Sequence, residues 1–433
     1  IVNHILKTRR RIVKNNERIR AATRENKEAP EVTPDQGYTR PKVLVVLPVR
    51  KAVHHLVSNL IRLSPTTQSA TVVNQERFDE EFGEDPDAPP PRDGRPADWV
   101  ELLHGNADDC FVLGMCLAKR AIRLFSPFTS SDIIIASPLG LALLVQDNAD
   151  KKQNFDFLSS IEVVVMDQTD ALLMQNWEHV RTSLDATNKI PRKALDTDFS
   201  RIRGWCLDGH AKHLRQTVIL SAFATAEINA LFSRHCHTAF ARYRSIERPE
   251  GVLQHVALSA RQVFQRLPTE SLQDMDQARF TFFVTRIVPR LIQTGQSHTL
   301  IFVRSYFDFV RIRNYFRKEE VSCAMCCEYS KGTDLTRSRS RFFHGERLLM
   351  LFTERLHHFK RPKLRGIQSI FFYQLPWRAE FYTELVNMMS DRGGGLQVTT
   401  LFHRVDRLEL QRVVGVDRAD TLLTSTKQAH LFC

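Results

Sequence analysis

The chain has 433 residues, enough for roughly two or three domains, because a single hydrophobic core rarely grows past roughly 250 residues. Hydrophobic residues make up 42% and charged residues 25% of the sequence, a globular composition that excludes a fibrous or wholly disordered protein. The formal net charge of +12 favours an acidic partner, and nucleic acid is the commonest such partner.

The cysteines and the apolar segments bear on the cellular compartment. The eight cysteines have no regular spacing, and the sequence has neither a signal peptide nor an apolar run of about 18 residues. We therefore expect a protein of a reduced intracellular compartment with no membrane segment. Residues 1–6 have the pattern of an amphipathic helix that continues into the basic residues 7–11, so we expect the chain to begin inside a domain.

Short apolar runs bounded by polar or turn residues are the clearest structural signal. Their apolarity is continuous rather than alternating, which is what strands buried on both faces of a parallel sheet require. Helical stretches lie between them, so the sequence predicts an α/β fold with parallel sheets. Some runs precede residue 225 and the others follow residue 295, which predicts two sheets. The runs are residues 43–47, 133–135, 163–166, 218–220, 300–303, 348–352 and 370–373.

Residues 245–251, with Pro249 and Gly251, separate the two groups of runs and have the composition of a linker. We therefore expect a first lobe over residues 1–245 and a second over residues 246–433. An acidic, proline-rich stretch over about residues 80–97 is expected to be a surface insertion, because its composition does not support a packed element. It is interpreted either as an acidic docking loop or as a tolerated solvated loop.

Segments at the ends of the first runs suggest a ligand site, because ligands bind at the carboxyl ends of strands in open α/β sheets. In this order and spacing they resemble the Pro-Thr-Arg-Glu-Leu, Thr-Pro-Gly-Arg, Asp-Glu-Ala-Asp and Ser-Ala-Thr motifs of DEAD-box RNA helicases. The resemblance implies two RecA-like lobes. The segments are Pro48-Val49-Arg50-Lys51-Ala52, Ser137-Pro138-Leu139-Gly140, Asp167-Gln168-Thr169-Asp170 and Ser221-Ala222-Phe223.

The second half continues this resemblance. Ser305, after the run at 300–303, is expected to cap the next helix together with Asp308. Residues 353–355, Thr-Glu-Arg, lead to Arg365-Gly366, which looks like the helicase stretch in which a Thr-Asp pair precedes Arg-Gly-Ile-Asp. A Leu-Pro dipeptide at residues 375–376 stands where those helicases have one. By this resemblance, Arg365 is expected at an interface between the lobes.

Departures from the helicase pattern predict that the fold has lost its ATP chemistry. No Gly-x-x-x-x-Gly-Lys-Ser/Thr sequence occurs, so the sequence offers no phosphate-binding loop. Gln168 replaces the catalytic glutamate, and an amide does not act as a carboxylate base. Residues 381–389, Phe-Tyr-Thr-Glu-Leu-Val-Asn-Met-Met, contain no arginine finger. We therefore expect no catalytic residue and no cofactor, and Asp167 and Asp170 are expected to cap the following helix.

This combination of motifs and losses, with several further stretches, resembles the digestive organ expansion factor family of nucleolar pseudo-helicases. The resemblance covers nearly the whole chain. It implies a non-catalytic factor of the nucleolar small-subunit processome that supports early pre-rRNA processing. The implied partners are pre-rRNA, the box C/D small nucleolar RNP and other processome proteins. The matching stretches are residues 4–9, 37–44, 166–170, 215–217, 227–232, 340–345, 365–367 and 414–415.

Two basic segments are candidates for RNA contact, since cations bind phosphates and interleaved aromatic residues stack on bases. A solvated loop whose aromatic residues pin it to the lobe explains the longer segment as well. The shorter segment lies at a strand end, where helicases hold the RNA backbone. The candidates are Arg192, Lys193, Arg201, Arg203 and Trp205 in the longer segment, and Arg50 and Lys51 in the shorter one.

Cys323, Cys326 and Cys327 form a cluster that invites a zinc interpretation. They lie in a stretch typical of a buried strand, where cysteine behaves as a small hydrophobic residue, so we expect no metal site. Two alternative functions stay open. One is an active ATP-dependent RNA helicase whose phosphate loop lies upstream, and the other is a protein-only scaffold without RNA contact.

Overall fold

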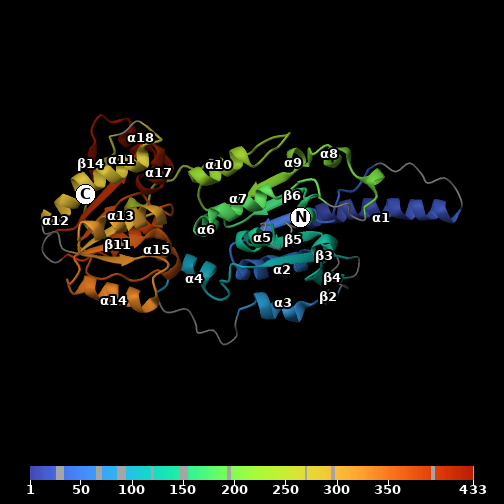
Figure 1. Cartoon of the computed structure of the whole chain (residues 1–433), viewed down its shortest axis with the longest axis horizontal. Helices are drawn as coiled ribbons and strands as arrows, with labels where there is room; N and C mark the ends of the chain where they lie inside the picture. Colours follow the sequence, from blue (N-terminus) through green and yellow to red (C-terminus); the bar gives the residue numbers. More distant parts are fainter. Residues whose placement is uncertain are drawn as a thin grey trace. The chain divides into compact units, whose positions relative to one another are not determined.

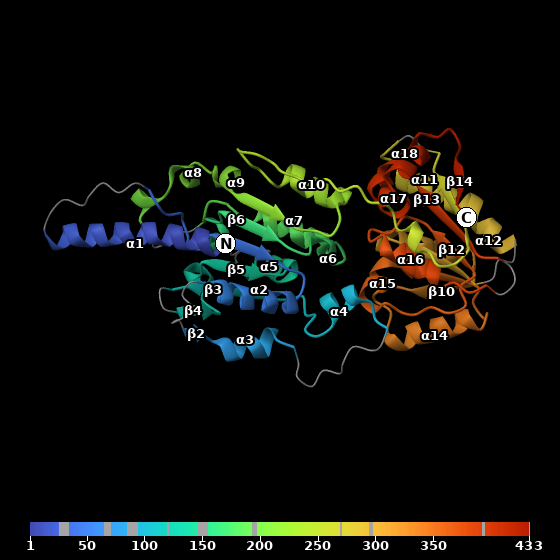
Figure 2. The same ribbon diagram turned by 180° about the vertical axis from the view of Figure 1, so that it is seen from behind.

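The computed structural model describes residues 1–25, 34–64, 71–84, 94–118, 121–145, 155–192, 197–268, 271–293, 298–391 and 395–432. The chain forms two compact units, Ile1–Arg244 and Ser245–Cys433. Each unit is built around one seven-stranded sheet with helices on both faces (Figure 1 and Figure 2). None of the described helices combines the length and the apolar character that crossing a membrane requires.

The sheet of the first unit is mainly parallel. Its strands are β1 (Val43–Val46), β2 (Thr71–Val73), β3 (Val112–Leu117), β4 (Ala121–Leu124), β5 (Ile133–Ala136), β6 (Val163–Met166) and β7 (Gln216–Ile219). They lie in the order β2-β4-β3-β5-β1-β6-β7. Neighbours from β5 to β7 are parallel, whereas β3 runs antiparallel to both β4 and β5. The predicted α/β fold is therefore confirmed, with β3 as the strand that runs antiparallel to both of its neighbours.

Helices cover both faces of this sheet. They are α1 (Val2–Arg24), α2 (Arg50–Leu63), α3 (Gln75–Phe82), α4 (Ala97–Leu103), α5 (Pro138–Val145), α6 (Thr169–Leu173), α7 (Trp177–Asp185), α8 (Gly204–Leu207), α9 (Ala211–Leu214) and α10 (Ala226–Arg234). Successive side chains of a strand point to opposite faces. Val43 and Val45 of β1 therefore pack with α1, α2 and α3, while Leu44 and Val46 pack with α5 and α7.

The sheet of the second unit is parallel except at one edge. Its strands are β8 (Arg261–Arg266), β9 (Thr299–Val303), β10 (Cys323–Cys326), β11 (Leu349–Thr353), β12 (Ser369–Phe372), β13 (Gln397–Phe402) and β14 (Ala429–Phe432). They lie in the order β10-β11-β9-β12-β13-β8-β14, and only β14 runs antiparallel to its neighbour among these strands. The prediction of a second mainly parallel sheet is confirmed.

Two hydrophobic layers hold the helices of the second unit to its sheet. The helices are α11 (Met275–Phe282), the π-helix η5 (Phe283–Ile287), α12 (Val288–Gln293), α13 (Tyr306–Lys318), α14 (Gly332–Phe343), α15 (Glu354–Lys360), α16 (Glu380–Asn387), α17 (Arg407–Val414) and α18 (Val416–Thr424). Leu300 and Phe302 of β9 pack with α14, α16 and α17, whereas Ile301 and Val303 pack with α13.

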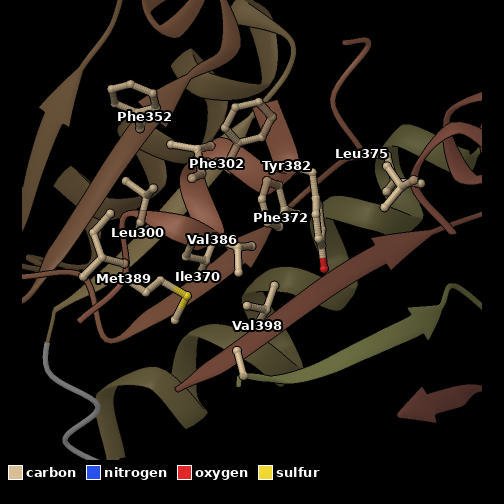
Figure 3. Packing of buried hydrophobic residues seen from close by; sticks show 14 of the residues in the cluster. Leu300, Phe302, Phe352, Ile370, Phe372, Leu375, Tyr382, Val386, Met389 and Val398 are labelled. Atoms are coloured by element: carbon tan, nitrogen blue, oxygen red, sulfur yellow. The ribbon is translucent and has the colours of Figure 1, made fainter. Parts of the chain in front are cut away.

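Aromatic side chains dominate the layer under α16 (Figure 3). Tyr382 of α16 stacks on Phe372 of β12, with 4.6 Å between the ring centroids. Its hydroxyl donates a hydrogen bond of 2.9 Å to Gln262 of β8, so the polar end of this buried ring is satisfied. The side chain of Tyr382 is therefore part of the core. It lies in the segment, residues 381–389, that contains no arginine finger.

Every apolar run that predicted a strand overlaps one, in β1, β5, β6, β7, β9, β11 and β12, and the cysteine stretch forms β10 as expected. The prediction missed β2, β3, β4, β8, β13 and β14. In β3 the apolar run is interrupted by Gly114. A side chain there would lie only 2.3 Å from the backbone oxygen of Ser126, so the close approach of that loop requires glycine.

The acidic stretch expected as an insertion over residues 80–97 differs from the prediction at both ends. Residues 80–82 form the last turn of α3, where Phe82 is buried and stacks on Phe78 with 5.1 Å between ring centroids. At the other end, Ala97 begins α4. These two phenylalanines, one helical turn apart, attach this end of the stretch to the core of the first unit. Residues 85–93 lie outside the described part of the chain.

Candidate nucleic-acid interface

The helicase-like segments of the first unit gather at one edge of its sheet. Because β5, β1, β6 and β7 are parallel and in register, their carboxyl ends lie side by side. Asp170 Oδ1 accepts a hydrogen bond of 3.2 Å from the backbone N–H of Ala222, which joins two of the segments. Gln175 Nε2 donates to the carbonyl of Pro48 at 2.8 Å, which joins a third. The structure therefore brings together residues that are far apart in the sequence.

Gln168 occupies the N-cap position of α6 in a left-handed conformation, with φ of 52°. Its side chain makes no capping bond, and its buried Oε1 has no hydrogen-bond partner among the described atoms. Asp167 Oδ1 accepts from the N–H of Gln168 at 2.8 Å, and Ser221 Oγ donates to the carbonyl of Phe223. The carboxylate of Asp167 therefore binds the backbone at the start of α6, whereas that of Asp170 binds the N–H of Ala222.

Arg50 and Lys51 begin α2 at the end of β1, as expected, but both charges are already compensated. Arg50 lies 3.0 Å from the carboxylate of Asp108, and Lys51 lies 2.9 Å from that of Glu84. The hydrogen bond from Lys51 lowers the pKa of Glu84 below its ordinary value, so this carboxylate stays charged. An RNA phosphate would have to displace these carboxylates to reach either cation.

The backbone at the start of α2 is also occupied. The N–H of Arg50 donates to the carbonyl of Asp108 at 3.0 Å, and the N–H of Lys51 donates to that of Asn106 at 3.0 Å. Free N–H groups at a helix start are what a phosphate needs. Here these amides have protein partners, so they are not free to bind a phosphate of an RNA backbone at the end of β1.

Arg201 is buried, which corrects its prediction as an RNA contact. Its guanidinium forms two-pronged hydrogen bonds to the fully buried carboxylate of Asp35, from Nη2 at 2.8 Å and from Nε at 3.2 Å, and a further bond to Asn16 at 2.6 Å. Asn15 donates to the same carboxylate at 2.8 Å. Arg201 therefore links the loop before α8 to the start of the chain. Because its guanidinium is paired and buried, it is unavailable to a phosphate.

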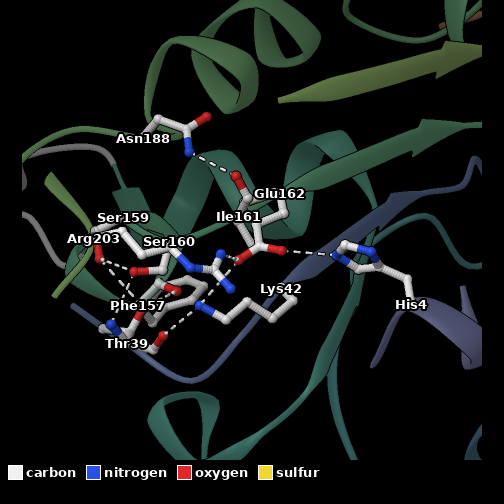
Figure 4. Close-up of polar contacts among 10 residues, drawn as sticks. All are labelled: His4, Thr39, Lys42, Phe157, Ser159, Ser160, Ile161, Glu162, Asn188 and Arg203. Atoms are coloured by element: carbon white, nitrogen blue, oxygen red, sulfur yellow. Dashed lines mark hydrogen bonds and ion pairs between the residues drawn. The ribbon is translucent and has the colours of Figure 1, made fainter. Parts of the chain in front are cut away.

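Arg203 belongs to a second buried charge cluster, around Glu162 (Figure 4). Glu162 lies 2.8 Å from the imidazole of His4 and 3.6 Å from the ammonium of Lys42. Burial acts to raise the pKa of Glu162, but the hydrogen bond with His4 and the charges of Lys42 and Arg203 outweigh it and lower the pKa to about 2. This cluster joins α1, β1 and β6, and leaves Arg203 little freedom to bind RNA.

Arg192 and Trp205 are the described members of the longer basic segment that remain accessible. Arg192 is exposed and lies over the ring of Phe155 at 5.0 Å. Trp205 is 41% exposed and packs against Arg203, which fixes one side of the indole. Lys193 lies outside the described residues. The two accessible side chains suit a phosphate contact and a base contact respectively.

The helicase-like residues of the second unit follow β11. Arg365 is exposed, and Gly366 adopts φ of 82°, a conformation that favours glycine. Burial raises the pKa of Glu354 to about 8 against the opposing charge of Arg304, and its Oε1 accepts from the N–H of Trp377 at 2.9 Å. Glu354 therefore joins the start of α15 to the segment before α16.

The expected capping box after β9 is absent. Ser305 is the N-cap residue of α13, but its side chain makes no capping bond. Asp308 instead accepts a hydrogen bond of 2.9 Å from Gln374, which follows β12. Tertiary pairing between neighbouring strand ends has therefore replaced the local motif.

Metal-binding residues do not cluster in the described part of the chain, where no group of three His, Cys, Asp or Glu side chains is placed to hold an ion. Cys323 and Cys326 lie in β10. Burial raises the pKa of Cys326 to about 11, so this thiol is neutral near pH 7. A neutral thiol in a strand packs as an apolar side chain.

The sequence interpretation missed a basic surface on α14. An open hollow there is lined by hydroxyl groups of Thr333, Thr336 and Ser340 and by Arg337 and Arg341. The signal was present in the alternating Arg-Ser-Arg-Ser-Arg of residues 337–341. Whether these arginine side chains reach solvent depends on which side of the helix faces the core, and the sequence does not show that directly.

Comparisons with known proteins follow this geometry. A solved structure described as "Crystal structure of hypothetical ATP-dependent RNA helicase from Sulfolobus tokodaii" is 14% identical, with a TM-score of 0.28, over 91% of this chain and 98% of that chain. The human "U3 small nucleolar RNA-associated protein 25 homolog" is 42% identical over 100% of this chain and 58% of that protein. "Protein NUCLEOLAR FACTOR 1" of Arabidopsis thaliana is 40% identical over 100% of this chain and 60% of that protein.

The chain thus spans less than two thirds of the length of these relatives. Two family models match it: "UTP25, NTP hydrolase-like domain" over residues 1–241, and "Utp25, C-terminal domain" over residues 252–432. Because these models together cover almost the whole chain, we conclude that it belongs to the Utp25 family.

Proposed function

We propose that this chain is a non-catalytic assembly factor of the nucleolar small-subunit processome. In this role it binds pre-rRNA, the box C/D small nucleolar RNP and processome proteins, and supports early processing of the small-subunit rRNA in the nucleolus. The names of its relatives, which are called U3 small nucleolar RNA-associated proteins, support this assignment. We infer that the digestive organ expansion factor resemblance and the Utp25 match denote one family.

The observation that carries the non-catalytic part is Gln168 at the end of β6. The chain has no Gly-x-x-x-x-Gly-Lys-Ser/Thr sequence to hold the phosphates of a nucleotide. Gln168, in the position of the catalytic glutamate, offers a neutral amide with a buried oxygen. These features together favour a RecA-like fold kept for binding.

The helix after β12 supports the same conclusion within the second unit. Where active helicases carry the arginines that stabilise charge on the transferred phosphoryl group, α16 presents Phe381 and Tyr382. Both side chains are completely buried, and Tyr382 stacks on Phe372. The loss of an arginine finger costs roughly 10³- to 10⁵-fold in rate in related chemistry.

We expect no ATP turnover by the purified chain, with or without RNA, and none by the Gln168→Glu variant. The chain has neither a phosphate-binding loop nor an arginine finger. A carboxylate restored at residue 168 therefore has no positioned phosphate group on which to act. The measurement is phosphate release and nucleotide binding, with an active DEAD-box helicase as the positive control. RNA-stimulated turnover by the wild-type chain would make it a divergent helicase instead.

In the first unit, we propose Arg192 and Trp205 as the residues that reach RNA, because both are accessible. Arg50, Lys51 and Arg203 contribute only where RNA displaces their carboxylate partners. This extensive pairing favours a second candidate, a scaffold in which the first unit contacts only proteins. Affinity for RNA that falls steeply with salt supports the RNA-binding factor, and the absence of RNA binding supports the scaffold.

A further inference from the structure

The helix α14 has one buried and one exposed side. Leu335 and Phe342, about two turns apart, are buried in the core against the sheet of the second unit. Thr333, Arg337 and Ser340 occupy the opposite side at helical spacing and are exposed. The apolar side therefore fixes the direction in which the polar side faces solvent.

The exposed side borders an open hollow of about 670 Å³. Its lining combines the side chains of Thr333, Thr336 and Ser340 with the guanidinium groups of Arg337 and Arg341. The carboxylate of Glu346 also borders the hollow. Guanidinium and hydroxyl donors in one concave surface are the groups that hold phosphate oxygens. We refer to the five donor residues, with the adjacent Lys331, as the α14 surface.

The charges of the α14 surface are less compensated than those of the first unit. Neither Lys331 nor Arg337 takes part in an ion pair among the described residues, and both are exposed. Arg341 lies 3.5 Å from Glu346, but both side chains are about half exposed or more, so water weakens this pair. Arg50 and Arg201, by contrast, are held by carboxylates in less exposed positions.

Aromatic side chains stand immediately before α14. Tyr329 is 65% exposed and meets Tyr306 edge-on, with 5.0 Å between ring centroids, so its ring is held in place with a face left open. The turn that carries it is closed by a hydrogen bond of 2.9 Å from the N–H of Ser330 to the carbonyl of Cys327. Lys360 adds a bond of 2.8 Å to the carbonyl of Ser330. The turn is therefore rigid, which favours stacking of an unpaired base.

We propose that single-stranded RNA binds along the α14 surface, with its phosphates on Arg337 and Arg341 and a base stacked on Tyr329. Lys331 lies between these two kinds of contact in the sequence. An acidic peptide would use the cations but not an exposed aromatic ring, so the combination fits RNA better. This site is in the second unit and is independent of the residues proposed above for the first unit.

The test measures binding of a fluorescent single-stranded oligouridine to the purified chain by anisotropy over a range of salt concentrations. The double variant Arg337→Ala/Arg341→Ala is expected to bind at least about tenfold more weakly than the wild type. Each phosphate contact to a single strand adds about 0.7 to the slope of log K against log salt, so the slope should fall by about 1.4. Tyr329→Ala is expected to weaken binding about fivefold or more without changing this slope.

The matched control is Arg317→Ala/Lys318→Ala, which removes the same charge from exposed positions at the end of α13. It is expected to bind RNA within about twofold of the wild type, since it leaves the α14 surface intact. All variants alter exposed side chains, and their melting temperatures show whether the fold is retained. Equal losses in the test and control variants would overturn the proposal. Binding of polyglutamate as tight as that of oligouridine, with the same dependence on Arg337, would also overturn it.

Discussion

Replacing Glu162 by glutamine is expected to lower the free energy of unfolding of the first unit by about 3 to 5 kcal/mol, the usual cost of breaking a buried ion cluster. Glu162 is the anion shared by His4, Lys42 and Arg203. The side chain of Lys42 is only 6% exposed, so it has no access to solvent as a substitute partner. Glutamine keeps the shape of the side chain but leaves Lys42 and Arg203 without a counter-charge.

The measurement is thermal unfolding near pH 7. The melting temperature should fall by about 10 °C, given about 2–4 °C for each kcal/mol in a unit of this size. Glu178→Gln is the matched control, because Glu178 pairs with Arg181 on the surface, where both side chains are at least half exposed. Its effect should stay within about 1 kcal/mol. Equal melting temperatures for the two variants would contradict a structural role for the Glu162 cluster.

The same carboxylate predicts how stability depends on pH. The folded pKa of Glu162 is about 2, against an ordinary value of 4.5, because its cationic partners outweigh the effect of burial. Below pH 4.5 the unfolded chain therefore takes up the proton first, and the folded state loses its advantage as the pH falls toward 2. The difference in melting temperature between the wild type and Glu162→Gln should shrink across this window. A difference that stays constant would contradict the lowered pKa.

Replacing Arg201 by glutamine is also expected to lower the free energy of unfolding by about 3 to 5 kcal/mol. Here the group left without a partner is an anion rather than a cation. The variant leaves a carboxylate unpaired, since Asp35 is fully buried and takes its main hydrogen bonds from Arg201. Asn15 still donates to Asp35, but one neutral amide does not replace a two-pronged guanidinium.

Chemical denaturation of Arg201→Gln, with Arg192→Gln as the control, separates a structural role from an RNA role. Arg192 is exposed, so its replacement should leave the denaturation midpoint nearly unchanged and weaken only RNA binding. Arg201→Gln should lower the denaturant concentration at the midpoint of unfolding. At denaturant concentrations below that midpoint, the folded variant should bind RNA like the wild type. If Arg201→Gln instead kept its stability and lost RNA binding, the original prediction for Arg201 would be right.

The central strands were predictable because their burial leaves a direct mark on the sequence. A strand such as β1, with every residue buried, must be apolar throughout. Among the missed strands, β2, β8, β13 and β14 are less uniformly apolar, whereas β3 is apolar and buried except for the interruption at Gly114. β8 carries polar residues through Arg261–Arg266, and β14 alternates between exposed and half-buried positions. Backbone pairing at a sheet edge imposes little on side chains, so it left no comparable signal.

The candidate site was predicted by residue type, but the partners of those residues were not. Arg201 and Asp35 are separated by 166 positions, and no local pattern relates them. Arg50 and Asp108 meet only because the loop before β3 folds over the start of α2. The sequence therefore located basic residues correctly while leaving open whether their charges were free. For the α14 surface, the arginine pattern was visible in the sequence. Only the packing of Leu335 and Phe342 in the core shows which side of the helix faces solvent.

The central claim is that this chain binds RNA without a nucleotide cycle, and its most direct test is the effect of ATP on RNA affinity. The dissociation constant for a single-stranded RNA would be measured without nucleotide, with Mg-ATP and with a non-hydrolysable analogue. Binding of two ligands is reciprocal, so an intact nucleotide site coupled to RNA must change this constant. We predict equal constants under all of these conditions. A tenfold tightening with ATP would contradict the account and point to a working helicase core.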